Sequence, residues 1–168
     1  MSFAKTAIYR LKTEFEDIDA GGVVHHPTYL KFYERARCNQ IAEGGYSFDQ
    51  MLKEGLAIAV AEVYMSYRRP IGMYQTVSIL SRVIGVKRSN MKVRQAIVSA
   101  ETTPEQAQAV GDDFEKLPGL YHWMDVRLVC VDLKEMKTLV LPTALLSAMG
   151  LPEQSEWPES FDDVRVKP

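Results

Sequence analysis

Residues 17–27 carry the residue types best suited to chemistry in this chain. Within these eleven residues lie two carboxylates, two adjacent glycines and two of the three histidines: Asp17, Asp19, Gly21, Gly22, His25 and His26. A loop uses glycines for backbone conformations with positive φ, but a purely structural loop does not need this density of titratable groups. Carboxylates and imidazoles can serve as nucleophile, acid, base or metal ligand. This stretch is therefore the candidate functional site.

The next residues predict a long helix whose beginning bears on that chemistry. Pro27 suits the first position of a helix, where its missing N–H is no loss, and helical composition continues until Gly44-Gly45. At helical spacing the following residues share one apolar face: Tyr29, Leu30, Phe32, Tyr33, Ala36 and Ile41. The start of a helix presents free N–H groups and the positive end of the helix dipole. A carbonyl oxygen held there would be polarised without a metal.

The same residues allow interpretations other than a catalytic carboxylate at a helix start. Asp19 could be an ordinary turn residue, and His26 could cap the helix. Adjacent histidines rarely both reach one ion, and no cysteine or further histidine has ligand spacing, so we expect no metal site. A G-x-S-x-G motif for a serine nucleophile is absent from the sequence.

The remaining elements predict an α+β fold. Besides the long helix, we expect strands at 5–15, 56–67, 75–87, 91–100 and 125–133, and short helices at 46–55 and 142–149. Helices followed by a run of antiparallel strands favour a curved antiparallel sheet of about five strands wrapped around one helix.

Two segments of this predicted sheet are unusual. In the strand at 56–67, small and apolar residues are expected to share one face: Ala57, Ala59, Ala61, Val63 and Met65. Residues 101–119 have the character of an insertion between two strands, with five acidic residues and one lysine. This insertion could cover an end of the sheet or shape a pocket.

Composition excludes several classes of protein. A net charge of -2 over 168 residues gives no basic field for nucleic acid. No stretch approaches the 18 or more apolar residues that cross a membrane, and the N-terminus lacks the apolar core of a signal peptide. The two cysteines, Cys38 and Cys130, are interpreted as free thiols of a reducing compartment. We expect a cytoplasmic protein with one domain at residues 1–150 and a proline- and acid-rich tail at 151–168.

Longer motifs in this sequence resemble one family. The pattern D-x-D-A-G-G-V-V-x-H-x-x-Y at residues 17–29 and the run F-Y-E-R-A-R at 32–37 resemble the hotdog-fold acyl-CoA thioesterases. The branch most similar is the 4-hydroxybenzoyl-CoA thioesterase type, together with the thioesterases associated with the Tol-Pal system. Weaker matches are Y-x-x-P at 67–70, V-C-V-D at 129–132 and a proline after the last strand. The resemblance covers about residues 5–149.

The resemblance implies specific catalytic roles. The acid at the position of Asp19 attacks the thioester carbonyl or activates water, and the backbone amide at His26 stabilises the oxyanion while its side chain lines the site. Asp17 is expected to help or to hold the loop. Coenzyme A leaves as a thiolate, so no dissociable cofactor is implied.

Further residues are candidates for substrate contact. Those near the loop are Gly21, Gly22, Val24, His25 and Tyr29. Lys87 and Arg88 form a basic turn that could clamp the phosphates of coenzyme A, although a solvated hairpin end explains the same charges. In the family, relatives pair their sheets, so the resemblance implies a homodimer or homotetramer whose sites lie at the subunit interface. Residues near 65–69 of one chain would then face the Asp19 loop of the other.

Two alternative functions remain open for a hotdog protein. One is a hydratase or dehydratase acting on acyl thioesters, which would use a histidine with a carboxylate on the helix. The other is a non-catalytic acyl-CoA-binding protein, which would not need the Asp19 carboxylate. The acyl group itself is not indicated by the sequence.

Overall fold

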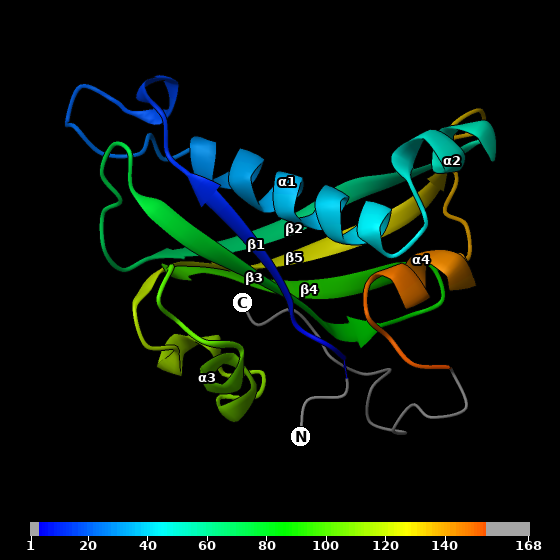
Figure 1. Cartoon of the computed structure of the whole chain (residues 1–168). Helices are drawn as coiled ribbons and strands as arrows, with labels where there is room; N and C mark the ends of the chain where they lie inside the picture. Colours follow the sequence, from blue (N-terminus) through cyan, green and yellow to red (C-terminus); the bar gives the residue numbers. More distant parts are fainter. Residues whose placement is uncertain (1–3, 154–168) are drawn as a thin grey trace.

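A curved antiparallel sheet wrapped around one long helix forms the molecule (Figure 1). The computed structural model describes residues 4–153. Its sheet has the strand order β1-β3-β4-β5-β2, with every neighbouring pair antiparallel. The strands are β1 (Ala7–Lys12), β2 (Leu56–Tyr67), β3 (Thr76–Val86), β4 (Asn90–Ser99) and β5 (Leu120–Asp132). The helices are α1 (Thr28–Glu43), α2 (Phe48–Lys53), α3 (Pro104–Ala109) and α4 (Thr143–Ala148), with short 3-10 turns η1 (Phe15–Asp17) and η2 (Phe114–Lys116). The predicted fold class is confirmed.

The main core lies between α1 and the sheet. Side chains at helical spacing, Tyr29, Phe32, Tyr33 and Ala36, are nearly inaccessible to solvent and meet apolar residues of the sheet. Of the predicted apolar face only Leu30 turns substantially outward. Burial of this face, rather than local propensity, stabilises α1. The packing fixes the N-terminal end of α1 over one end of the sheet.

Strand β5 begins earlier than the sequence predicted. It starts at Leu120 rather than at residue 125, because the additional residues pair with both neighbours. His122 lies opposite Tyr67 of β2 and opposite Ile97 of β4. This extension brings a histidine and a tyrosine together from segments more than fifty residues apart.

The predicted alternation along β2 is wrong beyond Val60. A register shift between Val60 and Glu62 inserts Ala61 as an extra residue, and such a bulge moves the following side chains to the other face. Val63 and Met65 therefore lie on the face towards α1, whereas Ala57 and Ala59 lie on the opposite face. The five residues expected on one face are divided between two.

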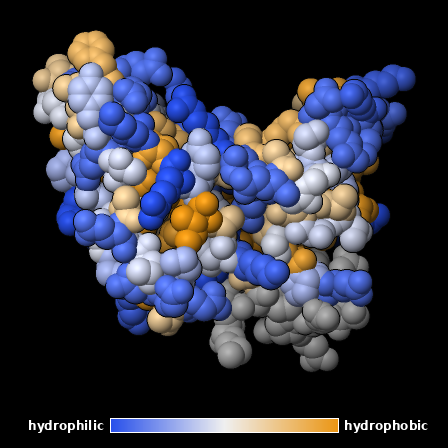
Figure 2. Space-filling view, viewed as in Figure 1, coloured by the Kyte–Doolittle hydropathy of each residue, from blue (hydrophilic) through white to orange (hydrophobic). Residues whose placement is uncertain are grey.

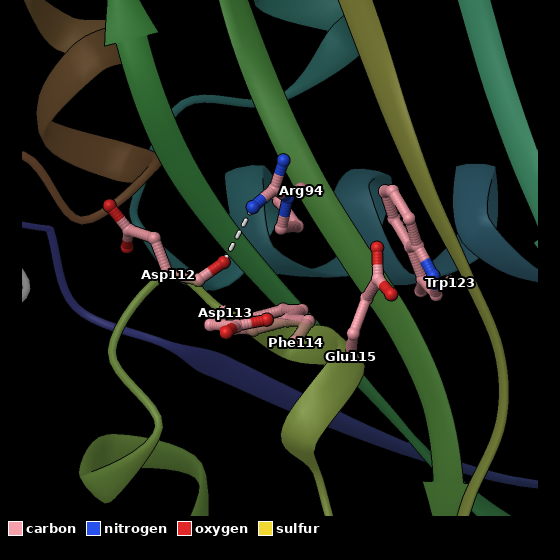
Figure 3. A pocket seen from close by; sticks show the side chains of 6 residues that line it. All are labelled: Arg94, Asp112, Asp113, Phe114, Glu115 and Trp123. Carbon is pink, nitrogen blue, oxygen red and sulfur yellow. Dashed lines mark hydrogen bonds between the residues drawn. The ribbon is translucent and has the colours of Figure 1, made fainter. Parts of the chain in front are cut away.

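The insertion at residues 101–119 covers the face of the sheet opposite α1, with α3 below the sheet in Figure 1. It forms a second apolar cluster in which Phe114 and Leu117 pack against Leu80 and Trp123. Polar contacts hold it there, since Arg94 donates to the carbonyl of Asp112 at 2.6 Å (Figure 3). The insertion thus covers a face of the sheet rather than one of its ends.

A buried arginine fastens the same insertion. Arg82 of β3 is fully inaccessible and donates to the carbonyls of Gly111 and Ala107 and to the Thr6 hydroxyl. Its nearest carboxylate is Asp112 at 3.3 Å. Burial lowers the pKa of the Arg82 guanidinium, an effect that Asp112 partly offsets.

The tail prediction lies almost entirely outside the described residues. Within them, Leu151 is buried in the main core and its amide donates to the carbonyl of Leu146. This residue therefore belongs to the domain rather than to the tail. No helix in residues 4–153 is long and apolar enough to cross a membrane.

Candidate functional site

The loop before α1 is held by Asp17. The Asp17 side chain is buried and its Oδ2 accepts a hydrogen bond from the Glu14 amide at 2.8 Å. Its carbonyl accepts from the His25 amide at 2.8 Å. Gly22 has a φ of 78°, a conformation that favours glycine. Of the two roles expected for Asp17, helping the chemistry or holding the loop, these contacts show the second.

Asp19, in contrast, is exposed to solvent. Its Oδ1 accepts a hydrogen bond from the Gly21 amide at 2.8 Å, while Oδ2 has no hydrogen-bond partner within residues 4–153. A Cβ atom added at Gly21 would lie 3.1 Å from Oδ1. Gly21 is thus the residue that leaves room for the carboxylate, and one carboxylate oxygen remains available.

The start of α1 differs by one residue from the prediction, because Pro27 precedes the first helical residue, Thr28. No side chain makes a cap hydrogen bond there, so His26 is not a helix cap. Within the described residues the His26 amide donates to no carbonyl, and its own carbonyl accepts from the Tyr67 hydroxyl at 3.1 Å. An unpaired amide beside a helix N-terminus is suited to bind an oxyanion.

A cavity of about 350 Å³ joins Asp19 to this helix start. Four predicted site residues line it: Asp19, Val24, His26 and Tyr29. The other lining residues are Val23, Tyr67, Arg68, Arg69 and Pro70. Its wall at 67–70 belongs to the same chain, so this wall does not require the partner chain that we expected to supply it.

Other predicted residues lie away from this cavity. Gly21 and Gly22 shape the loop without lining the cavity, and the His25 ring rests edge-on against His26 with ring centroids 4.9 Å apart. Lys87 and Arg88 are exposed at the far end of β3, an eleven-residue strand about 35 Å long. A single chain therefore does not bring this basic turn to Asp19.

Two arginines occupy the mouth of the cavity instead. Arg69 donates through Nε to the carbonyl of Leu120 at 2.9 Å, and its guanidinium lies over the Tyr121 ring. Arg68 pairs with Glu115 of the insertion at 3.0 Å. Both are solvent-accessible cations within reach of a charged ligand. The sequence analysis expected residues near 65–69 to face the Asp19 loop of a partner chain, but it did not single out these two side chains.

An aromatic cluster that includes two residues of the cavity wall was also missed. The rings of Tyr29, Tyr33 and Tyr67 each contact His122, and those of Tyr29 and Tyr67 also contact each other. Burial lowers the pKa of His122 to about 4 and raises the pKa of Tyr33 well above its ordinary value. His122 is fully buried. Only the pairing of β2 with β5 reveals this cluster.

The chemistry that the cavity can support is limited. Asp19 is the one carboxylate among its lining residues, and the helix contributes Tyr29 rather than the acid that a hydratase would use there. Residues 4–153 contain no group of three or more His, Cys, Asp or Glu side chains arranged to hold a metal ion.

Comparison with known sequences identifies relatives. A family model described as the thioesterase-like superfamily matches residues 13–161. The chain is 28% identical over 144 residues to the acyl-CoA thioester hydrolase YbgC of Escherichia coli O6:H1, covering 84% of this chain and 96% of that protein. It is 27% identical over 133 residues to the long-chain acyl-CoA thioesterase FadM of Escherichia coli K12, covering 79% and 88% of the two chains.

Solved structures show the same architecture. A 1,4-dihydroxy-2-naphthoyl-CoA thioesterase from Synechocystis superposes with a TM-score of 0.71 at 17% identity, covering 86% of this chain and 95% of its own. A DHNA-CoA thioesterase from Staphylococcus aureus gives a TM-score of 0.67 at 21% identity, with 81% and 80% covered. At these identities the likeness shows a shared fold, the hotdog fold.

Proposed function

Since the chain belongs to the thioesterase-like superfamily, we propose that it hydrolyses acyl-CoA thioesters to the free acid and coenzyme A. Relatives named as acyl-CoA thioesterases match most of its length, which supports this reaction class. The observation that carries the proposal is the shared cavity of Asp19 and His26 at the start of α1. That cavity combines a free carboxylate oxygen with an unpaired backbone amide.

Asp19 is the proposed catalytic carboxylate. It either takes a proton from a water molecule as the water oxygen attacks the thioester carbon, or it attacks that carbon itself and water then cleaves the resulting anhydride. In both routes the carbon–sulfur bond breaks, coenzyme A leaves as a thiolate, and a proton restores its thiol. The free Oδ2 of Asp19 supports either role.

The backbone at the helix start is proposed to stabilise the developing oxyanion. As the carbonyl carbon becomes tetrahedral, negative charge gathers on its oxygen, and an unpaired N–H is most effective there. The His26 amide lies beside the N-terminus of α1, whose dipole favours negative charge. This arrangement needs no metal or dissociable cofactor, and we propose that the reaction uses none.

A homodimer, or a homotetramer built from two such dimers, is the proposed assembly. Strand β2 is an edge of the sheet, and apolar side chains such as Val60, Val63 and Tyr64 are partly exposed along it. An exposed strand edge of this kind favours pairing with another strand. In such a dimer Lys87 and Arg88 of one chain are proposed to contact the phosphates of coenzyme A bound to the other.

We also propose a cytoplasmic location. Cys38 and Cys130 are unpaired, which fits a compartment that keeps thiols reduced.

Hydrolysis of a panel of acyl-CoA esters, followed by the appearance of free thiol, tests the proposed activity directly. We expect thiol release that is stoichiometric with free acid and insensitive to a chelator. A purified protein that binds acyl-CoA without releasing thiol would instead be a binding protein. Formation of a hydrated acyl-CoA would indicate a hydratase.

A further inference from the structure

His122 is completely buried at the start of β5, behind the wall of the candidate site. Its Nδ1 lies 2.6 Å from the Tyr33 hydroxyl. Its ring packs against Tyr29 with centroids 4.7 Å apart and against Tyr67 at 4.4 Å. Both of these tyrosines line the cavity that contains Asp19. A single layer of aromatic rings therefore separates His122 from the cavity.

The second ring nitrogen of His122 has no hydrogen-bond partner among the described residues. An unpaired buried nitrogen is costly, and buried polar atoms are almost always paired with protein, water or a ligand. The two nitrogens of an imidazole point in divergent directions, so Nε2 faces away from the Tyr33 hydroxyl. Besides Tyr33, the aromatic rings in contact with the imidazole are those of Tyr29 and Tyr67, and both residues belong to the cavity wall.

Tyr67 is the movable part of that wall. Its side chain is half exposed, whereas Tyr29 is almost fully buried under α1. One hydrogen bond, from its hydroxyl to the carbonyl of His26, holds it in place. Of the two cavity-lining rings that contact His122, that of Tyr67 is therefore the one with more room to rotate.

His122 is neutral in this environment. The groups that face it are the tyrosines of α1 and Tyr67 of β2, and no carboxylate pairs with it in residues 4–153. A neutral imidazole has one N–H and one lone pair. If the Tyr33 proton points to the His122 carbonyl, which lies 3.2 Å away, Nε2 is an acceptor; if it points to Nδ1, Nε2 is a donor. A hydroxyl group satisfies either form.

From this geometry, and on the premise that the proposed function holds, we propose that His122 determines acyl specificity. Its Nε2 binds a hydroxyl group carried by the acyl chain, which reaches it between Tyr29 and Tyr67. The site therefore favours acyl groups that carry a hydroxyl within reach of Nε2 over the same groups without it. Sites that hydrogen-bond a substrate hydroxyl discriminate strongly against analogues that lack it, because the buried partner is then left unpaired.

Matched substrate pairs test this proposal with the full-length protein. The pairs are hydroxybenzoyl-CoA with benzoyl-CoA, and hydroxybutyryl-CoA with butyryl-CoA. We expect kcat/KM of the wild type to favour the hydroxylated member of at least one pair about tenfold or more. His122→Phe should reduce that ratio to about one while the unsubstituted substrate is hydrolysed within about threefold of the wild-type rate.

Two further variants separate specificity from a structural effect. His122→Gln keeps a polar amide at the position and should retain part of the preference. Trp123→Phe changes the next residue, whose side chain lies on the opposite face of the sheet, and should leave the preference unchanged. If His122→Phe fails to fold, the wild-type ratios and His122→Gln decide the question.

The outcomes distinguish a failure of the His122 specificity role from a failure of the proposed acyl-CoA hydrolysis. A wild type that hydrolyses none of the four esters and no other acyl-CoA overturns the proposed function. Hydrolysis without a preference for either hydroxylated ester overturns only the role of His122 and leaves a trapped water as the partner of Nε2. An unchanged preference in a folded His122→Phe protein has the same consequence.

Discussion

The Asp19 carboxylate accepts a hydrogen bond from the Gly21 amide at 2.8 Å, and within the part of the chain that the structure describes it does so through one oxygen only. This contact holds one oxygen of a carboxylate that lines the same cavity as His26 and Tyr29, while the second oxygen stays free of partners in residues 4–153. The neighbouring Asp17 uses its side chain to hold the loop. Two aspartates separated by one residue therefore have different tasks, and the Gly21 contact is the difference on which the proposed chemistry depends.

The first prediction concerns Gly21 and Gly22. A Cβ at Gly21 would lie 3.1 Å from Oδ1 of Asp19, so Gly21→Ala should displace the carboxylate and lower kcat about tenfold with little loss of stability. At Gly22 a Cβ meets nothing within 4 Å, but φ is 78°. Gly22→Ala should therefore cost about 1–2 kcal/mol of stability through backbone strain. Steady-state kinetics and thermal unfolding of both variants measure the contrast, and full activity in Gly21→Ala would refute this account of Gly21.

The second prediction concerns stability in acid. Burial depresses the pKa of His122 to about 4 in the folded protein, below its ordinary value of 6.5. Between these values the unfolded chain binds a proton that the folded chain does not, so stability falls as pH drops from about 6.5 to about 4. This residue contributes nothing to the pH dependence above that window. The loss can reach about 3 kcal/mol.

His122→Phe is the matched control for that pH dependence. It removes the buried imidazole while the carboxylates that also titrate in acid remain. Denaturant unfolding of both proteins at several pH values should give a difference in ΔG of unfolding that changes between pH 6.5 and 4. Parallel curves for the two proteins would contradict the buried neutral state of His122.

The third prediction is that the insertion at residues 101–119 contributes to stability and not to catalysis. Phe114 is fully buried against the face of the sheet opposite α1 and lies under the Arg82 guanidinium. Phe114→Ala should cost about 3–5 kcal/mol of stability, because it leaves a cavity in the second core. The kcat of the molecules that remain folded should stay close to wild type at low temperature. A large loss of kcat without loss of stability would place the insertion in catalysis.

The fourth prediction concerns the proposed dimer. Sedimentation at assay concentration should give twice the mass of one chain, and Val63→Arg on the edge strand should shift the protein to monomer and reduce activity. Val140→Arg is a suitable control, since Val140 is also exposed but lies outside β2. A wild type that is fully active as a monomer would contradict the dimer.

The sequence predicted the elements that depend on local chemistry. The glycine and proline positions and the apolar spacing located α1 within one residue, and the bounds of β2 were predicted correctly. Asp19, His26, Val24 and Tyr29 were expected at the site, and the structure places all four on one cavity. These features could be predicted because the motif, the turn and the start of the helix all depend on residues that are adjacent in sequence.

The residues that were missed depend on pairing between distant strands. His122 reaches Tyr67 only because β5 pairs with β2, and neither residue has a local signal of that contact. The bulge at Ala61 follows from the same pairing, since nothing in an alternating apolar run marks where the register shifts. The face that the insertion covers had no local signal either, because its few buried residues, such as Phe114, are separated by acids.

Asp19→Asn tests the central claim most directly. Asparagine keeps the shape of the side chain and the oxygen that accepts the Gly21 amide, but it cannot act as a nucleophilic carboxylate or a base. We predict an unchanged melting temperature and KM with a loss of kcat of about a thousandfold for the preferred acyl-CoA. Glu16→Gln, an exposed carboxylate on the same loop, should retain wild-type kcat. A folded Asp19→Asn protein that releases thiol at the wild-type rate would contradict the account.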